Sequence, residues 1–196
     1  MIRDVVGISF REEKPEGISP IKFSDRHCHF IRHAREGNTF YVHKEDINCP
    51  LARFYLGIGN TDSKNLARIL VSWNDSINEE MALEYLKSAQ NLEACKDYII
   101  YFPYTQTGIE PDVIIKVGTA DEIMSIIQRF SALTGMRVSA SLSGIGAACG
   151  ECTSYPLVTG RENVSLGCYG SRPGVGLKEG ELLLAFPNSS KMVEIC

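Results

Sequence analysis

The segment from Asp112 to Leu142 constrains the fold of this chain more than any other. Its first part, Asp112–Val117, is an apolar run that is typical of a buried strand. The residues Ala120–Leu133 then repeat their apolar side chains with the period of a helix, and Gly135 follows as a stop. Arg137–Leu142 has the pattern of a further strand. We therefore predict one βαβ unit around residues 112–142.

Shorter apolar patterns elsewhere in the chain predict further strands and helices, which together with this unit would form one domain. Further strands are predicted at Val5–Phe10, Ile18–Phe23, Thr39–Val42, Tyr98–Phe102 and Leu182–Phe186. Helices are predicted at Cys28–Glu36 and Asn78–Leu92, whereas Leu66–Trp73 suits either state. A length of 196 residues without a linker or low-complexity tract fits a single domain over residues 1–196. The expected fold is mixed α/β (α+β), with a mixed β-sheet flanked by helices.

The charge and apolar content exclude several classes of protein. A net charge of −4 argues against general nucleic-acid binding, which needs an excess of lysine and arginine. No apolar run approaches the roughly 18 residues that span a bilayer, so we expect no membrane partner. The first residues lack the basic and then apolar pattern of a secretory signal, so we expect a cytoplasmic protein.

Seven cysteines are the most distinctive chemical feature of the chain. They are Cys28, Cys49, Cys95, Cys149, Cys152, Cys168 and Cys196. An odd number in a chain without an export signal does not favour a disulfide framework. Three interpretations remain, namely buried small apolar residues, reactive thiols and metal ligands.

Two of these cysteines form a Cys-x-x-Cys pair behind a glycine-rich turn. The spacing of Cys149 and Cys152 lets two thiolates bind one metal or cluster, although a redox dithiol or two buried thiols would give the same pattern. Gly144 and Gly146 precede the pair and allow a ligand to approach the backbone closely. A dinucleotide-binding motif would have a glycine where Cys149 stands, so the motif gives little support to nucleotide binding.

Several basic residues and histidines could serve the same chemistry. Cys168 lies in a glycine-rich loop near Arg172, which is a favourable setting for a thiolate. On the predicted helix, Arg32 could bind an anionic ligand. His29 and His33 are one helical turn apart and could share a metal, but a solvated helix face is the simpler interpretation.

Several motifs in a fixed order connect the chain to a known family. They are Cys28-x5-Ala34-x2-Gly37, Pro111–Ile115, Cys149-x-Glu151-x4-Pro156-x3-Gly160 and Ser165–Arg172. Over most of its length the chain resembles the uncharacterised ArCR family, domain of unknown function family 169. That family has no assigned activity. The resemblance implies a pattern of four cysteines, at Cys28, Cys49, Cys149 and Cys168. It makes Cys152 an extra residue and requires neither His29 nor His33.

The first functional hypothesis is a cytoplasmic protein that binds an iron–sulfur cluster, foremost a [4Fe–4S] cluster, or else zinc. The predicted ligands are Cys28, Cys49, Cys149 and Cys168, with Cys152 as a substitute. The predicted ligand-binding residues are Arg32, Gly144, Gly146 and Arg172. A redox, sensing or substrate-binding role would follow, with a redox partner or a small anionic ligand. We expect the four cysteines to lie around one site.

Two other hypotheses need no metal. A thiol-dependent enzyme would use Cys149 or Cys168 as its nucleophile and a histidine of the early helix as its base. A non-catalytic sensor domain would hold a small anion between the glycine-rich loops and the basic helix. The sequence identifies no reaction, no catalytic residue and no oligomeric state.

Overall fold

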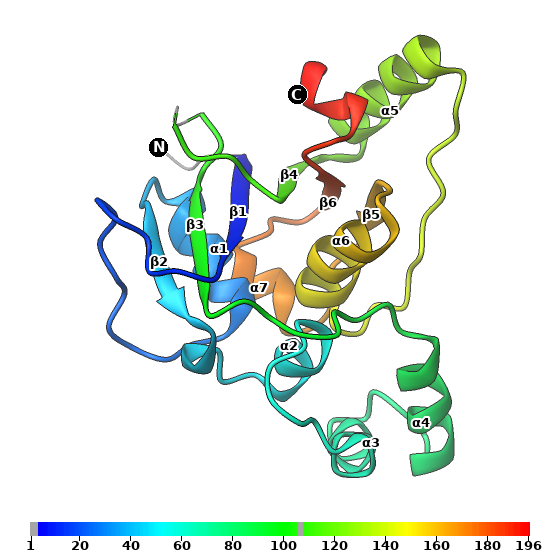
Figure 1. Ribbon diagram of the computed structural model, residues 1–196. Coiled ribbons are helices and arrows are strands. Elements are labelled where there is room, and N and C mark those ends of the chain that lie inside the picture. Colours follow the sequence, from blue (N-terminus) through cyan, green and yellow to red (C-terminus); the bar gives the residue numbers. More distant parts are fainter. Residues whose placement is uncertain (1–3, 106–107) are drawn as a thin grey trace.

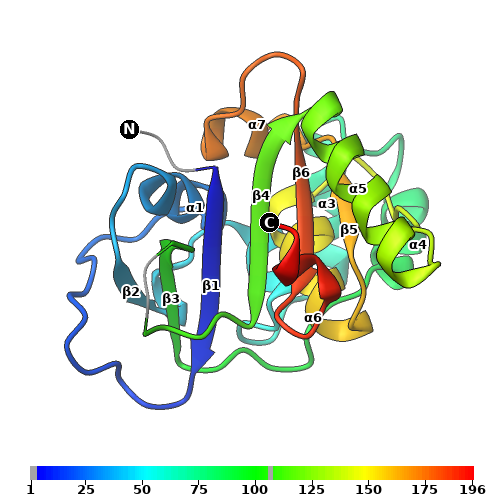
Figure 2. The same ribbon diagram turned by 90° about the horizontal axis from the view of Figure 1, so that it is seen from above.

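Six strands form one antiparallel sheet in the computed structural model, which describes residues 4–105 and 108–196. The strands are β1 (Val5–Arg11), β2 (Phe40–His43), β3 (Tyr98–Pro103), β4 (Val113–Thr119), β5 (Asn163–Ser165) and β6 (Glu181–Pro187). Their order across the sheet is β2-β3-β1-β4-β6-β5, as Figure 2 shows. Each neighbouring pair of strands runs antiparallel.

Helices flank this sheet and connect its strands. They are α1 (His27–Arg35), α2 (Pro50–Tyr55), α3 (Ser63–Ser72), α4 (Glu79–Ser88), α5 (Ala120–Thr134), α6 (Tyr155–Thr159) and α7 (Ser171–Val175). Two 3-10 turns are η1 (Lys44–Asp46) and η3 (Lys191–Glu194), and η2 (Ala147–Ser154) is a π-helix. Figure 1 shows α5 above the sheet and α2, α3 and α4 below it. In the part of the chain that the structure describes, no helix is both long and apolar enough to cross a membrane.

Side chains of alternate residues on the central strands pack into two different apolar cores, one on each face of the sheet. On β4, Ile114 packs with Phe130 of α5, whereas its neighbour Ile115 belongs to the larger core with Phe30 of α1. This alternation follows from the strand geometry, in which successive side chains point to opposite faces. The mixed α/β architecture with flanking helices is therefore confirmed, and both faces of the sheet are covered.

The predicted βαβ unit is correct in its first two elements and wrong in its third. The helix α5 begins after Thr119, which forms a capping box with Glu122, and it ends at Gly135 with a φ of 70°. Residues 137–142 form no strand and are largely exposed. They alternate polar with apolar residues, as an edge strand does, but they form no ladder. The N–H and the carbonyl of Ser141 bond instead to the side chain of Asn163 on the edge strand β5, at 2.7 Å and 3.0 Å. The sheet is accordingly antiparallel and not mixed, and it contains no βαβ unit.

The other predicted elements are mostly confirmed. Ile18–Phe23 is the exception, because it contributes only an isolated bridge between Pro20 and Tyr41. Proline has no N–H to donate to a strand ladder, which limits pairing at this point. The ambiguous segment Leu66–Trp73 is helical and forms most of α3, while α4 ends at Ser88, before the predicted end of that helix.

We predict that the α5 layer depends on Phe130. Its side chain is 1% exposed, whereas Leu133 on the same helix is 68% exposed. Phe130→Ala should therefore lower the free energy of unfolding by about 3–5 kcal/mol, because it leaves a cavity between α5 and the sheet. Leu133→Ala should change it by less than about 0.5 kcal/mol. Urea denaturation of both variants measures the difference, and equal effects would show that α5 does not pack as described.

Candidate functional site

Four of the seven cysteines line one cavity of about 660 Å³. They are Cys28, Cys49, Cys149 and Cys168. Further lining residues are Arg26, His27, Asn48, Trp73, Asp75 and Tyr169. We call this space the cysteine cavity. Its volume falls within the roughly 300–1,000 Å³ that is usual for pockets that bind small molecules. Residues far apart in the sequence thus line one space, as we expected of these four cysteines.

Backbone pairing ahead of α1 brings the first two cysteines together. The N–H of Asp25 donates to the carbonyl of Asp46 at 2.9 Å, and the N–H of Asn48 donates to the carbonyl of Asp25 at 3.1 Å. Cys28 follows three residues after Asp25, in the first turn of α1, and Cys49 follows Asn48 as the N-cap of α2. The starts of the two helices are therefore held side by side.

The π-helix η2 carries the third cysteine, and all eight of its residues are buried. Gly146 precedes η2 in the left-handed region with a φ of 63°. A Cβ atom at Gly146 would lie 2.4 Å from the ring of Tyr55, and one at Gly150 would lie 2.6 Å from the same ring. Glycine is thus required at both positions for α2 to pack on η2, which places Cys149 in the cavity. π-Helical turns are frequent at functional sites.

The fourth cysteine is held beside the first by α7. The N–H of Ser171 donates to Sγ of Cys168 at 3.3 Å, and the N–H of Cys168 donates to Oγ of Ser171 at 2.8 Å. Helix α7 packs on α1 at Gly174, where a Cβ atom would lie 2.5 Å from Sγ of Cys28. This close contact brings the Cys168 loop to the start of α1.

All four cysteines lie at the N-terminal ends of helical segments. Cys28 is in the first turn of α1, Cys49 caps α2, Cys149 is in the first turn of η2, and Cys168 precedes α7. The first turn of a helix has free N–H groups and a partial positive charge. Such a setting favours negatively charged sulfur, so this arrangement could offset part of the charge of several thiolates.

Unless a metal binds them, the thiols of Cys28 and Cys149 hold their protons at neutral pH. Burial, followed by the charges of Cys49 and Cys168, raises the pKa of Cys28 to about 12, while Arg26 acts in the opposite direction. Burial also raises the pKa of Cys149 well above its ordinary value, and the other three cysteines of the cavity add to this shift.

His27 joins three elements behind the cavity. Its Nδ1 lies 2.7 Å from the hydroxyl of Tyr101 on β3, and its Nε2 lies 2.9 Å from Oγ1 of Thr153 on η2. Because Thr153 donates its own hydrogen to the carbonyl of Ala148 at 2.8 Å, it accepts from Nε2. The other ring nitrogen then accepts from Tyr101. Burial lowers the pKa of His27 to about 3, so the ring is neutral.

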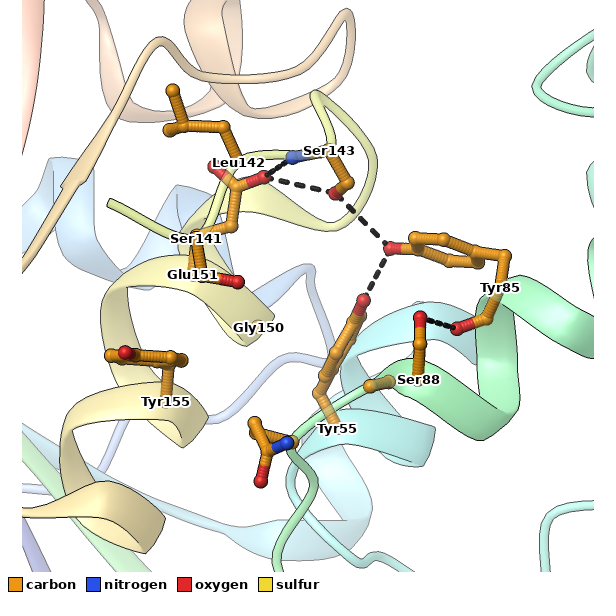
Figure 3. A pocket seen from close by; sticks show the side chains of 11 residues that line it. Tyr55, Tyr85, Ser88, Ser141, Leu142, Ser143, Gly150, Glu151 and Tyr155 are labelled. Atoms are coloured by element: carbon orange, nitrogen blue, oxygen red, sulfur yellow. Dashed lines mark hydrogen bonds between the residues drawn. The ribbon is translucent and has the colours of Figure 1, made fainter. Parts of the chain in front are cut away.

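A buried carboxylate fixes the glycine-rich turn next to η2. Oε1 of Glu151 accepts hydrogen bonds from the N–H of Ser143 at 2.6 Å and of Gly144 at 3.0 Å, and from the hydroxyl of Ser143 at 2.9 Å. Its Oε2 accepts from the hydroxyl of Ser165 at 2.5 Å. Figure 3 shows this carboxylate turned toward Ser143. Glu151 therefore holds the turn at Ser143 and Gly144, which leads into the cavity, by hydrogen bonds.

A second, smaller pocket of about 250 Å³ lies on the other side of Tyr55. In Figure 3 the hydroxyl groups of Tyr55 and Tyr85 point toward each other, and they form a hydrogen bond. Tyr85 also donates to the carbonyl of Ile145 at 2.8 Å. Burial raises the pKa of Tyr85 to about 12 and raises that of Tyr55 further. The two phenols are thus neutral donors that tie α2 and α4 to the glycine-rich turn.

Several predicted ligand-binding residues lie outside the cysteine cavity. Arg32 pairs with Glu36 at 3.0 Å on the surface of α1. Arg172 donates to the backbone carbonyls of Leu166, Lys178 and Glu181, at distances of 2.7–3.2 Å. Gly144 binds Glu151, and only Gly146 of the predicted set lines the cavity. The ligand-binding role predicted for Arg32, Gly144 and Arg172 therefore receives no support from their positions.

The remaining metal candidates of the sequence have other surroundings. Cys152 is fully buried beside Glu151 and Ser165 and does not line the cavity. His29 pairs with Asp25 at 2.6 Å, and His33 lies 3.5 Å from Glu36. Within residues 4–105 and 108–196, no three histidine, cysteine, aspartate or glutamate side chains form a group that could hold a metal ion. Metal ligation by the four cavity cysteines thus stays a prediction.

Sequence reasoning missed His27, Glu151 and the tyrosine pair as organising residues. Their partners are remote, since His27 and Thr153 are 126 positions apart. The position of Glu151 within a family motif was the one available signal.

Comparison with known proteins gives the family of the chain but assigns no activity. An uncharacterised protein of Methanocaldococcus jannaschii is 28% identical over 180 residues, which cover 90% of this chain and 77% of that protein. No solved structure shows a significant match. The sequence profile of the uncharacterised ArCR family, a domain of unknown function, matches residues 1–194. The chain therefore belongs to the uncharacterised ArCR family.

Proposed function

We propose that the protein binds an iron–sulfur cluster, foremost a [4Fe–4S] cluster, and has a redox, sensing or substrate-binding role. One observation carries the proposal: Cys28, Cys49, Cys149 and Cys168 line one cavity from the starts of four helical segments. A set of four thiolates is the usual ligand set of such a cluster. When bound, the cluster would supply one-electron chemistry or an iron atom that accepts a ligand.

The size of the site supports a cluster over a single zinc ion. Four sulfur ligands of one zinc ion, at bonds of about 2.3 Å, lie roughly 3.8 Å apart. The ligands of a cluster lie farther apart, at roughly 6–7 Å, because they surround a larger core. The cavity of about 660 Å³ has room for that core.

The charge of the surroundings supports the same proposal. Four thiolates and the sulfides of a cluster carry negative charge, which a buried site must compensate. The four helix starts present N–H groups and positive partial charges, and Arg26 adds a full positive charge.

The thiol-enzyme hypothesis has weaker support. Among the described residues that line the cavity, His27 is the only histidine, and both of its ring nitrogens are engaged. Its lowered pKa of about 3 makes it a poor base. The raised pKa of Cys149 keeps that thiol protonated, whereas nucleophilic attack requires a thiolate.

Replacement of the cavity cysteines tests the ligand assignment. Cys28→Ser, Cys49→Ser, Cys149→Ser and Cys168→Ser should each lower the iron content and the broad absorption near about 400 nm of anaerobically purified protein. Cys95 is buried outside the cavity, so Cys95→Ser is the matched control and should retain both signals. A colourless parent protein without iron or sulfide would contradict the proposal. Loss of iron from the Cys95→Ser variant with an intact fold would contradict the ligand assignment.

The raised thiol pKa values predict a pH dependence of cluster retention. Because Cys28 and Cys149 are protonated in the metal-free site, ligation releases their protons, and acid favours the metal-free form. The loss of iron to a chelator should therefore increase as the pH falls from about 9 to about 6. Iron released at each pH, measured with circular dichroism as a check on folding, tests this. Retention that is independent of pH would show that the thiols are not the ligands.

A further inference from the structure

Two sets of side chains stand out in the lining of the cysteine cavity, beside apolar residues such as Leu51 and Ala148 and the already bonded Asp25 and His27. The sulfur atoms form the first set. The second set consists of Arg26, Asn48, Trp73, Asp75 and Tyr169. These five side chains make no hydrogen bond or ion pair with the residues that the structure describes. Ligand pockets typically combine apolar walls with a few converging polar groups of this kind.

Arg26 is the one cationic side chain among the described residues that line the cavity. Its neighbour Asp25 is already bound to His29 at 2.6 Å, so it does not neutralise the guanidinium. The guanidinium lies beside the Cys168 loop, 3.7 Å from the position of a Cβ atom on Gly170. A planar guanidinium with free donors binds a carboxylate through two parallel hydrogen bonds.

A tight turn after α3 places Trp73 and Asp75 at the same cavity. Asn74 lies between them with a φ of 61°, the only positive φ of a non-glycine residue in the described chain. Backbone hydrogen bonds from Asn74 to Val71 and from Asp75 to Leu70 hold the turn. A left-handed asparagine is less unfavourable than most residues but still costs energy. The turn thus gives the cavity an aromatic wall and a carboxylate.

Trp73 and Asp75 differ from ordinary surface side chains. Trp73 is 48% exposed and lines the cavity, so part of its ring is available to pack against an occupant. Asp75 is half-buried and has no cationic partner within salt-bridge distance among the described residues. A carboxylate in this position accepts hydrogen bonds from a hydroxyl or an amino group.

We propose that this side of the cavity binds a small organic carboxylate that carries a hydroxyl or amino group and an apolar body. Arg26 holds the carboxylate, Trp73 packs against the apolar body, and Asp75 accepts a hydrogen bond from the hydroxyl or amino group. The inference rests on the proposed function in one respect, namely that the cluster occupies the sulfur side. The ligand then lies next to the cluster.

Calorimetric titration of the anaerobically purified protein with phenyllactate tests this site. Phenyllactate should bind saturably, and it should change the fluorescence of Trp73, the single tryptophan of the chain. Arg26→Gln should weaken binding by about tenfold or more, because a charge-assisted hydrogen-bonded pair is lost. Arg32→Gln is the matched control, since Arg32 lies on the same helix, pairs with Glu36 and does not line the cavity.

Two further probes define the ligand class. Phenylpropionate lacks the hydroxyl and should bind more weakly than phenyllactate to the parent protein, but the two should bind equally to the Asp75→Ala variant, which has no side-chain acceptor. Inorganic phosphate should bind more weakly than both. No saturable binding, equal binding by the Arg26→Gln variant, or phosphate binding as tight as that of phenyllactate would overturn the inference. The iron content of the same samples separates the two proposals, because phenyllactate binding without iron would contradict only the cluster.

Discussion

Burial of the π-helix η2 is the constraint on which the rest of this structure depends. A buried helix that carries Glu151, Thr153 and other polar residues is stable only if each polar group finds a partner. The structure meets this requirement, since no buried side-chain nitrogen or oxygen of the described residues lacks a hydrogen bond. The partners come from α1, β5 and the loops at Gln90 and Ser143, so the polar groups of η2 fix these segments around it. The position of Cys149 follows from that network.

The same network explains how a site can form from residues that are remote in sequence. The bond of His27 to Thr153 sets α1 against η2, and the bond of Ser165 to Glu151 sets β5 against η2. Each of these elements carries or precedes a cavity cysteine. Neutral histidine and protonated thiols avoid buried charge while no metal is present. In a bound cluster, iron would take the place of the thiol protons. The negative charge of the cluster would be compensated by the N–H groups of the four helix starts and by Arg26.

Much of the fold could be predicted from the sequence because local pattern and final environment agree. Val5–Phe10 and Tyr98–Phe102 are apolar because they lie in the centre of a covered sheet, and α5 has its cap, period and stop in consecutive residues. The prediction for Arg137–Leu142 was wrong because a period of two shows that a strand is possible, whereas here a side chain of the edge strand, Asn163, takes the backbone groups of Ser141. The grouping of the four cysteines came from the family pattern. The roles of His27 and Glu151 depend on long-range hydrogen bonds, which leave no periodic trace in the sequence.

The contact of Tyr55 with η2 also has a consequence for the history of the family. The Tyr55 ring occupies the space that side chains at Gly146 and Gly150 would need. A mutation of either glycine is tolerable only after the ring has become smaller, and a smaller ring leaves a void and removes the hydrogen bond between Tyr55 and Tyr85. The three positions therefore form one evolutionary unit, which can change only through an intermediate of lower fitness. Across related chains they should be inherited together, even where the surrounding helices have diverged.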